Sequence, residues 1–202
     1  LLIKVKTLDQ IAGVIAHELG HVVGGHFAKI NQAYKDSSLI TILSSLLALG
    51  AIAGGAPEAG NALILGGQHL SQANLLSFSR SQESYADQTS IRLLLKSGFS
   101  LNGLLDMFKL LEQNEKFKQF NPYFLTHPLS SKRKRNIQMH LGSQKFVNSF
   151  EDLEKRFRLI KAKLYGFFLK QDALDKIYKN TSSLESNYAY SLRYYRIGKV
   201  DL

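Results

Sequence analysis

Cysteine is absent from the 202 residues of this chain. Its absence excludes disulfides, cysteine-ligated zinc and thiol nucleophiles, so any metal must be held by histidine and carboxylate side chains. It does not decide the compartment, because disulfide-free proteins occur in both the cytosol and the periplasm. The chain begins at Leu1 and carries no basic, then apolar leader, and we expect a processed or truncated product.

The alternation that is typical of β-strands is absent after residue 7. Only residues 1–7, "LLIKVKT", alternate weakly, as the end of a strand would. Further along, apolar side chains recur at helical spacing, first in a helix that Thr7 or Asp9 would cap. We therefore predict a mainly α protein with at most a strand remnant at its N-terminus.

Acidic residues are scarce, with 16 Asp and Glu against 26 Lys and Arg, which gives a net charge of +10. A basic chain can bind nucleic acid, anionic lipid or acidic proteins. No aromatic-studded RNA-binding signature accompanies the charge, and a solvated basic helical surface is the simpler interpretation. We expect no nucleic-acid partner; a basic surface-binding protein remains as an alternative, and its binding would be sensitive to salt.

The stretch "HELGH" contains His17, Glu18 and His21 in the HExxH pattern. Residues at i and i+4 leave the same face of a helix one turn apart, so both imidazoles can bind one Zn²⁺ at about 2.0–2.1 Å. Glu18 projects beside them, where a carboxylate can take a proton from the attacking water. The pattern therefore predicts a zinc hydrolase centre.

Two candidates exist for the third ligand. In HExxHxxGxxH enzymes the last histidine falls where this chain has Phe27, and His26 lies one place early. On a continuous helix His26 would point away from the zinc, and only a break at Gly24–Gly25 would change this. We favour Glu83, which would complete a His₂Glu site, with Asp87 one turn on accepting the other ring N–H of a ligating histidine.

The ordered motifs "HELGH", "SRSQESYAD" and "THPLSSKR" resemble the HtpX/BepA/CAAX-prenyl-protease family of zinc metallopeptidases, the forty-eighth in the metallopeptidase series. "GGQHLSQANLLSFSRSQE" and "AKLYGF" are most similar to its periplasmic, BepA-like branch. The resemblance implies a helical gluzincin core in which His17, His21 and Glu83 hold the zinc. Glu18 would be the general base, and Asp87 would be a carboxylate that supports a ligating histidine. The resemblance also places His127 and Arg133 near the active site. They would act as donors to the developing oxyanion, or His127 would occupy the water position in a self-inhibited state.

Residues 38–56 carry no charge and are nearly long enough to span a bilayer, which takes about 20 residues. A single crossing would separate His21 from Glu83. A return crossing through residues 59–79 would place many Gly, Gln, Asn and Ser residues in lipid. We therefore expect a buried helix, or a helix in contact with the membrane surface, rather than a two-pass hairpin.

We divide the chain into a metallopeptidase core at residues 1–148, truncated on its N-terminal side, and a helical tail at residues 149–202. The tail has the aromatic-then-glycine pattern that begins a tetratricopeptide array. The resemblance implies a periplasmic endopeptidase that acts on protein substrates in envelope quality control, with outer-membrane assembly components as partners of the tail. The alternative is a chaperone-like binding module whose zinc site is structural or self-inhibited.

Overall fold

The computed structural model describes residues 2–116, 127, 131–142, 144, 147–178 and 182–198. Within them the chain is helical, with α1 (Leu8–Val23), α2 (His26–Ala53), α3 (Pro57–Ser97), α4 (Leu101–Lys116), α6 (Ser131–Leu141), α7 (Glu151–Phe168), α8 (Gln171–Tyr178) and α9 (Leu184–Arg196). The prediction of a mainly α protein is confirmed. The described part of the chain contains no strand, which agrees with the prediction of at most a strand remnant; residues 2–4 form a turn.

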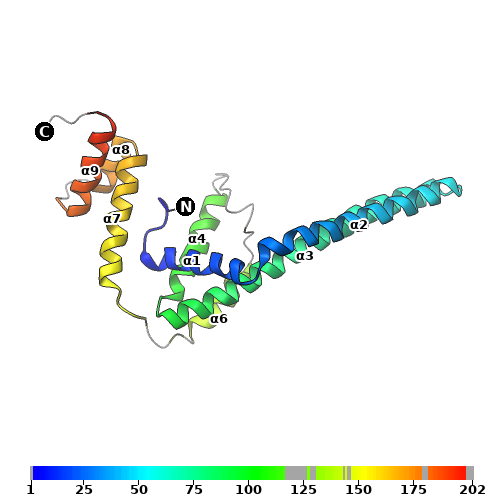
Figure 1. Ribbon diagram of the computed structural model, residues 1–202, viewed down its shortest axis with the longest axis horizontal. Helices are drawn as coiled ribbons and strands as arrows, with labels where there is room; N and C mark the ends of the chain where they lie inside the picture. Colours follow the sequence, from blue (N-terminus) through cyan, green and yellow to red (C-terminus); the bar gives the residue numbers. More distant parts are fainter. Residues whose placement is uncertain are drawn as a thin grey trace.

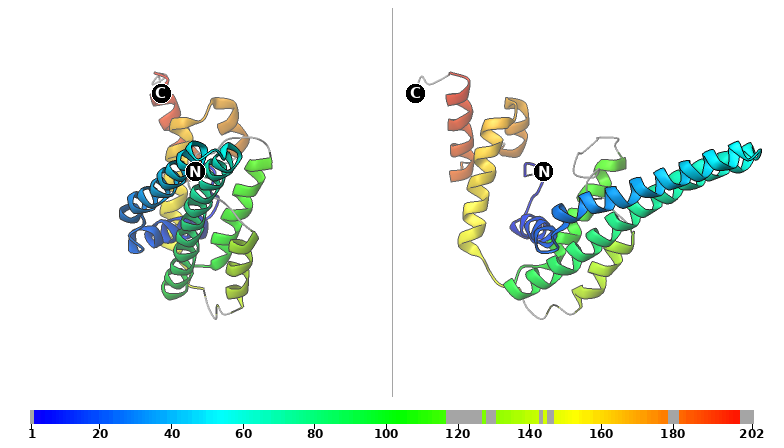
Figure 2. Two further views of the ribbon diagram at one scale, coloured as in Figure 1. Left: turned by 90° about the vertical axis from the view of Figure 1, so that its right-hand side faces the viewer. Right: turned by 45° about the vertical axis from the view of Figure 1, so that its right-hand side comes forward.

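Helix α1 crosses the centre of the body and packs against α3 and α4 (Figures 1 and 2). It begins where predicted, because the Thr7 hydroxyl accepts a hydrogen bond from Gln10 N at 3.2 Å. A Cβ on Gly13 would lie 2.9 Å from the backbone of Leu104, so a glycine there lets α1 and α4 approach closely. The core around these helices also draws on α6, and its buried members are Ala16, Ile91, Leu94, Leu101, Leu104, Leu105, Phe108 and Ile137.

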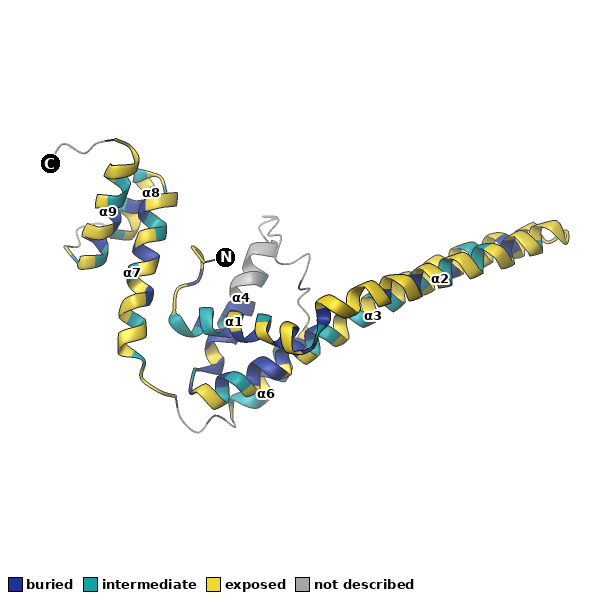
Figure 3. Cartoon of the chain, in the orientation of Figure 1, coloured by how far each residue is buried: buried dark blue, intermediate teal, exposed yellow. Residues whose placement is uncertain are grey.

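Helix α2 and the first part of α3 form an antiparallel hairpin that projects far from the body (Figures 1 and 2). Its inner seam is made of small and polar residues. Ser71 Oγ donates to the Ser37 carbonyl at 2.9 Å, and a Cβ on Gly67 would collide with Ser44. Many of the large apolar side chains are exposed instead. Most of the hairpin is coloured as exposed in Figure 3.

This arrangement corrects one expectation for residues 38–56. A buried helix is wrong, because α2 is largely exposed and its buried residues are His26, Ala33, Ser37 and Ala48. Helix α2 is also the one described helix that is long and apolar enough to cross a membrane, judged by length and composition. Contact with a membrane surface stays a prediction.

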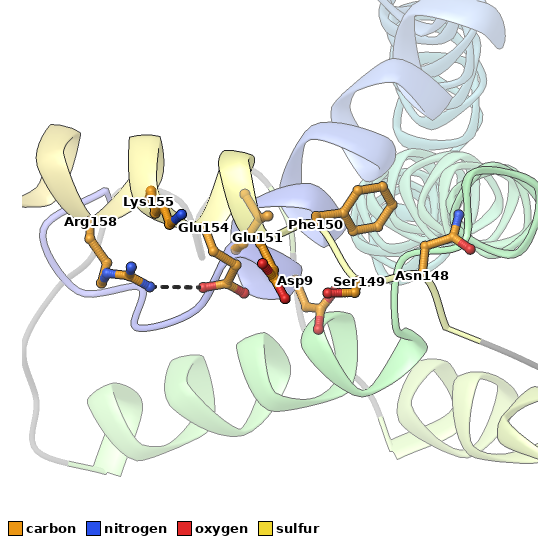
Figure 4. Close-up of a pocket in the computed structure, with 9 residues that line it drawn as sticks. Asp9, Asn148, Ser149, Phe150, Glu151, Glu154, Lys155 and Arg158 are labelled. Carbon is orange, nitrogen blue, oxygen red and sulfur yellow. Dashed lines mark ion pairs between the residues drawn. The ribbon is translucent and has the colours of Figure 1, made fainter.

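The tail helices α7, α8 and α9 pack around a small cluster of their own, formed by Ala162, Leu174 and Ala189. They lie on the opposite side of the body from the hairpin (Figure 1). Lys161 of α7 connects the tail to the N-terminal segment, because its Nζ donates to the carbonyls of Ile3 at 2.7 Å and Val5 at 2.5 Å. A hollow of about 360 Å³ opens where α1 meets the start of α7, lined by residues such as Asp9, Phe150 and Arg158 (Figure 4). The predicted site residues do not line it.

Candidate metal centre

His17 and His21 lie on one face of α1, as the i, i+4 spacing predicts. Both imidazoles are buried, and their Nε2 atoms are 3.1 Å apart. Two unprotonated ring nitrogens at this distance repel one another unless a proton or a cation lies between them. The pair is therefore arranged to share a positive charge.

The crossing of α1 and α3 brings Glu83 to these histidines. A Cβ on Gly20 would lie 2.7 Å from the backbone of Ala86, so the two helices touch at a glycine and an alanine. Glu83 consequently reaches both rings, with Oε2 3.3 Å from His17 Nε2 and Oε1 3.2 Å from His21 Nε2. The small residues of "HELGH" and "ESYAD" thus have a packing role that positions the polar ones.

His127 lies against the same three side chains. Its Nδ1 is 3.0 Å from Glu83 Oε1 and 3.4 Å from His17 Nε2. One donor atom from each of His17, His21, Glu83 and His127 lies within 4.8 Å of the others. The residues flanking His127 lie outside the described part of the chain.

These distances fit a zinc ion. Ligands at about 2.0–2.1 Å around a tetrahedral Zn²⁺ lie about 3.3–3.4 Å from one another. The printed contacts among His17 Nε2, His21 Nε2, His127 Nδ1 and the two carboxylate oxygens of Glu83 run from 3.0 to 3.4 Å, close to that edge length. Nitrogen and carboxylate oxygen are also the ligand types that zinc accepts when cysteine is absent. In this arrangement His127 takes the fourth position, where a catalytic site holds water.

Asp87 supports His17 from behind. Its Oδ1 is 3.0 Å from His17 Nδ1, the ring nitrogen that faces away from the cluster. A carboxylate here holds the proton on Nδ1 and leaves Nε2 as the metal-binding atom. Asp87 therefore lies where the sequence analysis expects a carboxylate that accepts the other ring N–H of a ligating histidine.

Arg133 of α6 holds the two carboxylates together. Its Nε and Nη2 bind both oxygens of Asp87 at 2.6 and 2.8 Å, and its Nη1 is 2.7 Å from Glu83 Oε2. The guanidinium also lies over the Phe108 ring, 4.9 Å from its centroid. This geometry favours an orienting role for Arg133, and its predicted role as a donor to the oxyanion stays a prediction.

The charges of the cluster shift its acids and bases in opposite directions. Burial opposes ionisation of Glu83, but hydrogen bonds from His127, His17 and His21 hold its pKa well below the usual range. The pKa of Asp87 is lowered in the same way, mainly by Arg133, against the effect of burial. Burial alone would lower the pKa of His17, but the hydrogen bonds to Asp87 and Glu83 raise it. The cluster thus favours positive charge at its centre, as a cation site must.

Glu18 differs from the residues around it in being half-exposed. Its side chain is 41% accessible, against 3% for Glu83, and its Oε1 lies 3.6 Å from His127 Nε2. It therefore borders both the cluster and solvent. A group that exchanges protons with a substrate needs this access, whereas a ligand does not.

The break at Gly24–Gly25, which the sequence analysis named as the exception, decides the direction of His26. Helix α1 ends at Val23, and Gly25 adopts a left-handed conformation with φ of 63°, so the chain turns and begins α2 at His26. His26 is buried, and its Nδ1 lies 2.8 Å from His21 Nδ1. It does not join the donor cluster, but it pairs with His21 as Asp87 pairs with His17. The Gly24–Gly25 pair was the available signal for this break.

The chain matches known proteins over most of its length. The model of peptidase family M48 matches residues 1–140. A beta-barrel assembly-enhancing protease of Escherichia coli K12 is 29% identical over 177 residues, covering 83% of this chain and 35% of the relative. The Yersinia pestis protein of the same name is 28% identical over 205 residues, covering 96% and 41%. Metalloprotease LoiP of E. coli K12 is 31% identical over 144 residues, covering 70% and 53%.

The chain thus spans between about a third and a half of the length of these relatives. No solved structure matches it. The family match covers the helix with His17 and His21, the helix with Glu83 and Asp87, and the segment with His127 and Arg133. The predicted family is confirmed: this chain belongs to peptidase family M48.

Proposed function

We propose that this protein is a zinc-dependent endopeptidase that hydrolyses peptide bonds in protein substrates. The observation that carries the proposal is the convergence of His17, His21 and Glu83 on one point, with the accessible carboxylate of Glu18 beside it. These three residues would hold the zinc. When bound, the ion would polarise the substrate carbonyl and make a nearby water more acidic.

The remaining chemistry belongs to the side chains. Glu18 accepts a proton from the attacking water and returns it to the leaving amine, for which its exposure to solvent is suited. Asp87 keeps the proton of His17 on Nδ1, and Arg133 holds Glu83 and Asp87 in place. His127 is close enough to Glu18 to act as the donor that stabilises a developing oxyanion.

His127 also supports the self-inhibited alternative. With its Nδ1 against Glu83 and His17, it fills the position that water would need. We propose that His127 must leave this position before hydrolysis and then acts as the donor. If it never leaves, the protein is a chaperone-like binding module with a closed zinc site.

The test is Glu18→Gln, which keeps the shape of the side chain and removes its basicity. We expect normal zinc content and loss of cleavage of a denatured protein substrate by at least about a hundredfold, the size of a general-base contribution. The experiment is run beside His127→Ala, which would open a self-inhibited site. Cleavage at the normal rate by Glu18→Gln would contradict the mechanism. Cellular function that survives Glu18→Gln would favour the binding module.

The names of the relatives suggest a setting. We propose that the protein acts in cell-envelope quality control, in the periplasm, on misassembled outer-membrane proteins. We also propose that residues 149–202 begin a tetratricopeptide-like array that binds assembly components. The cluster that α7, α8 and α9 form with one another supports this division of the chain, although Phe157 of α7 also packs with Val5, Val14 and Met107.

The hairpin supports contact with a membrane. Small residues line its seam and large apolar side chains face outward, the arrangement of helices that pack within lipid rather than in water. Residues 38–56 carry no charged side chain, and α2 is the described helix that is long and apolar enough to cross a membrane. We propose that the apolar outer surface of the hairpin contacts a membrane surface, with the metal cluster near that surface.

A further inference from the structure

A second cleft adjoins the metal cluster on the side of the hairpin. It has a volume of about 500 Å³ and shares His21, Glu83 and His127 with the cluster. Its size lies within the range of about 300–1,000 Å³ that is usual for ligand sites. A molecule that contacts the metal centre therefore has this cleft directly beside it.

The walls of the cleft come from two facing helices at matching spacing. Each contributes residues at i, i+3 and i+7, which are Phe27, Ile30 and Tyr34 from α2 and Leu75, Phe78 and Gln82 from α3. Five of these six side chains are apolar or aromatic. The spacing places each set on one face of its helix, so the walls are built on rigid elements rather than on loops.

The chemistry of this cleft differs from that on the other side of Glu83. The neighbouring hollow between α3 and α6 is lined by Arg80, Lys132, Arg133 and Arg135. In the hairpin-side cleft the charged residue is Glu83, which already contacts the histidines and Arg133. An apolar side chain can pack against these walls without burying an unpaired charge, whereas a charged side chain would find few polar groups beyond Ser79, Gln82 and the histidines and carboxylate of the cluster.

We propose that this cleft binds one large apolar side chain of the substrate, leucine-like or phenylalanine-like, next to the cleaved bond. We infer this occupant from the position of the cleft, which shares His21, Glu83 and His127 with the metal cluster. A peptide whose carbonyl lies at the cluster would therefore have its neighbouring side chain beside Ile30 and Phe78. The inference rests on the proposed peptidase function and adds its specificity. Burial of an apolar side chain against these walls would favour such substrates about tenfold or more over alanine.

The test uses dipeptide hydroxamates, whose metal-binding group anchors them at the cluster while one side chain is varied among Ala, Leu, Phe and Asp. Binding is measured on zinc-loaded wild type and on His127→Ala, in which His127 does not compete for the metal. We expect Leu and Phe compounds to bind at least about tenfold more tightly than Ala, and Asp to bind least. Ile30→Trp, which fills the cleft, should remove the preference, and Leu153→Trp on the exposed face of α7 should keep it.

Equal affinity for Leu, Phe and Ala compounds would overturn the proposal, as would a preference that Ile30→Trp leaves unchanged in a folded, zinc-loaded protein. Mapping cleavage sites in a mixture of synthetic peptides separates the two levels of inference. Glu18-dependent cleavage without an apolar residue at either side of the cut would refute the cleft and keep the peptidase. A hydroxamate preference without any Glu18-dependent cleavage would keep the cleft and refute the peptidase.

Discussion

The metal centre and the hairpin depart in opposite ways from the usual distribution of residues in a soluble protein. At the metal centre, charged and polar side chains are buried, with Glu83 and Asp87 at 3% and 1% exposure. On the hairpin, leucine and isoleucine side chains are exposed, with Leu46 and Leu47 at 60% and 63%. Buried charge and exposed apolar surface are the two informative exceptions to ordinary burial.

The two regions differ in how far the protein itself compensates for the exception. At the metal centre, Arg133, Asp87 and His26 satisfy the outer atoms of the ligands, and a cation would satisfy the inner ones. On the hairpin, small residues line the seam, and many large apolar side chains on the outer surface have no partner within the described chain to cover them. The comparison suggests that the first region is completed by an ion and the second by an apolar phase.

The strongest test of the metal centre is Glu83→Ala. We expect zinc content to fall from about one per chain to near zero, because the site loses its carboxylate ligand and the group that contacts His17, His21 and His127. The metal-free chain should also lose about 3–5 kcal/mol of unfolding free energy, the usual cost of breaking a buried ion pair. Metal analysis and chemical denaturation measure both effects. Glu112→Ala, which removes a solvent-accessible partner of Lys134, is the matched control. Unchanged zinc content would remove Glu83 from the ligand set.

The hairpin is tested by placing charge on its outer surface. Leu46→Lys together with Leu47→Lys should weaken binding to zwitterionic lipid vesicles by about a hundredfold, since burial of each leucine contributes about 1.5 kcal/mol or more. Vesicle flotation measures the loss. A control carries lysine at Leu184 and Tyr195, which are at least as exposed on the tail. If hairpin and tail variants bind vesicles alike, the hairpin surface has another purpose.

His26 provides a finer test, because it supports a ligand without being one. His26→Ala should weaken zinc affinity about tenfold to a hundredfold, as expected for loss of the hydrogen bond that orients a ligating histidine. His26→Gln retains an acceptor and should recover part of the affinity, which a purely structural role would not predict. Competition with a chelator gives the affinities, and His69→Ala on α3 is the control. Equal affinity in all four proteins would show that His26 does not orient His21.

The smallest predicted effect concerns Lys161, where the tail meets the N-terminal segment. Burial lowers its pKa to about 8 from 10.5. Between these values the unfolded chain binds the proton and the folded chain does not, so the contribution of Lys161 to unfolding free energy rises with pH in this window. We expect a rise of about 1 kcal/mol between pH 7.5 and 9.5 that is lost in Lys161→Met and kept in Lys163→Met. Denaturation curves at the two pH values would contradict this if the rise were the same in all three proteins.

Predictability from sequence differed between positions for physical reasons. His17, His21, Glu83 and Asp87 were accessible to sequence reasoning because each pair lies one turn apart within a single helix. The direction of His26 was left open between a continuous helix and a break at Gly24–Gly25, because it depends on one backbone angle at Gly25. The positions of Arg133 and His127 required helices and segments distant in the chain to meet, which spacing does not specify.

For the hairpin, too, residue spacing and composition do not specify the tertiary environment. Hydropathy identified residues 38–56 as unusual, but a charge-free helix has the same composition whether it is buried or exposed. Residues 1–7 have a weak strand pattern, but a strand forms only where a neighbouring strand pairs with its backbone hydrogen-bonding groups.

The sequence by itself determined the helical class, the family, the paired faces of α1 and α3 and the absence of cysteine ligands, because these depend on local spacing and composition. Only the tertiary structure decided that α1 and α3 touch at Gly20 and Ala86, so that one donor atom from each of His17, His21, Glu83 and His127 lies within 4.8 Å of the others. It also decided that His26 turns back to His21 and that the apolar surface of α2 faces outward. These outcomes depend on the approach of distant helices and on one left-handed glycine, which residue spacing does not encode.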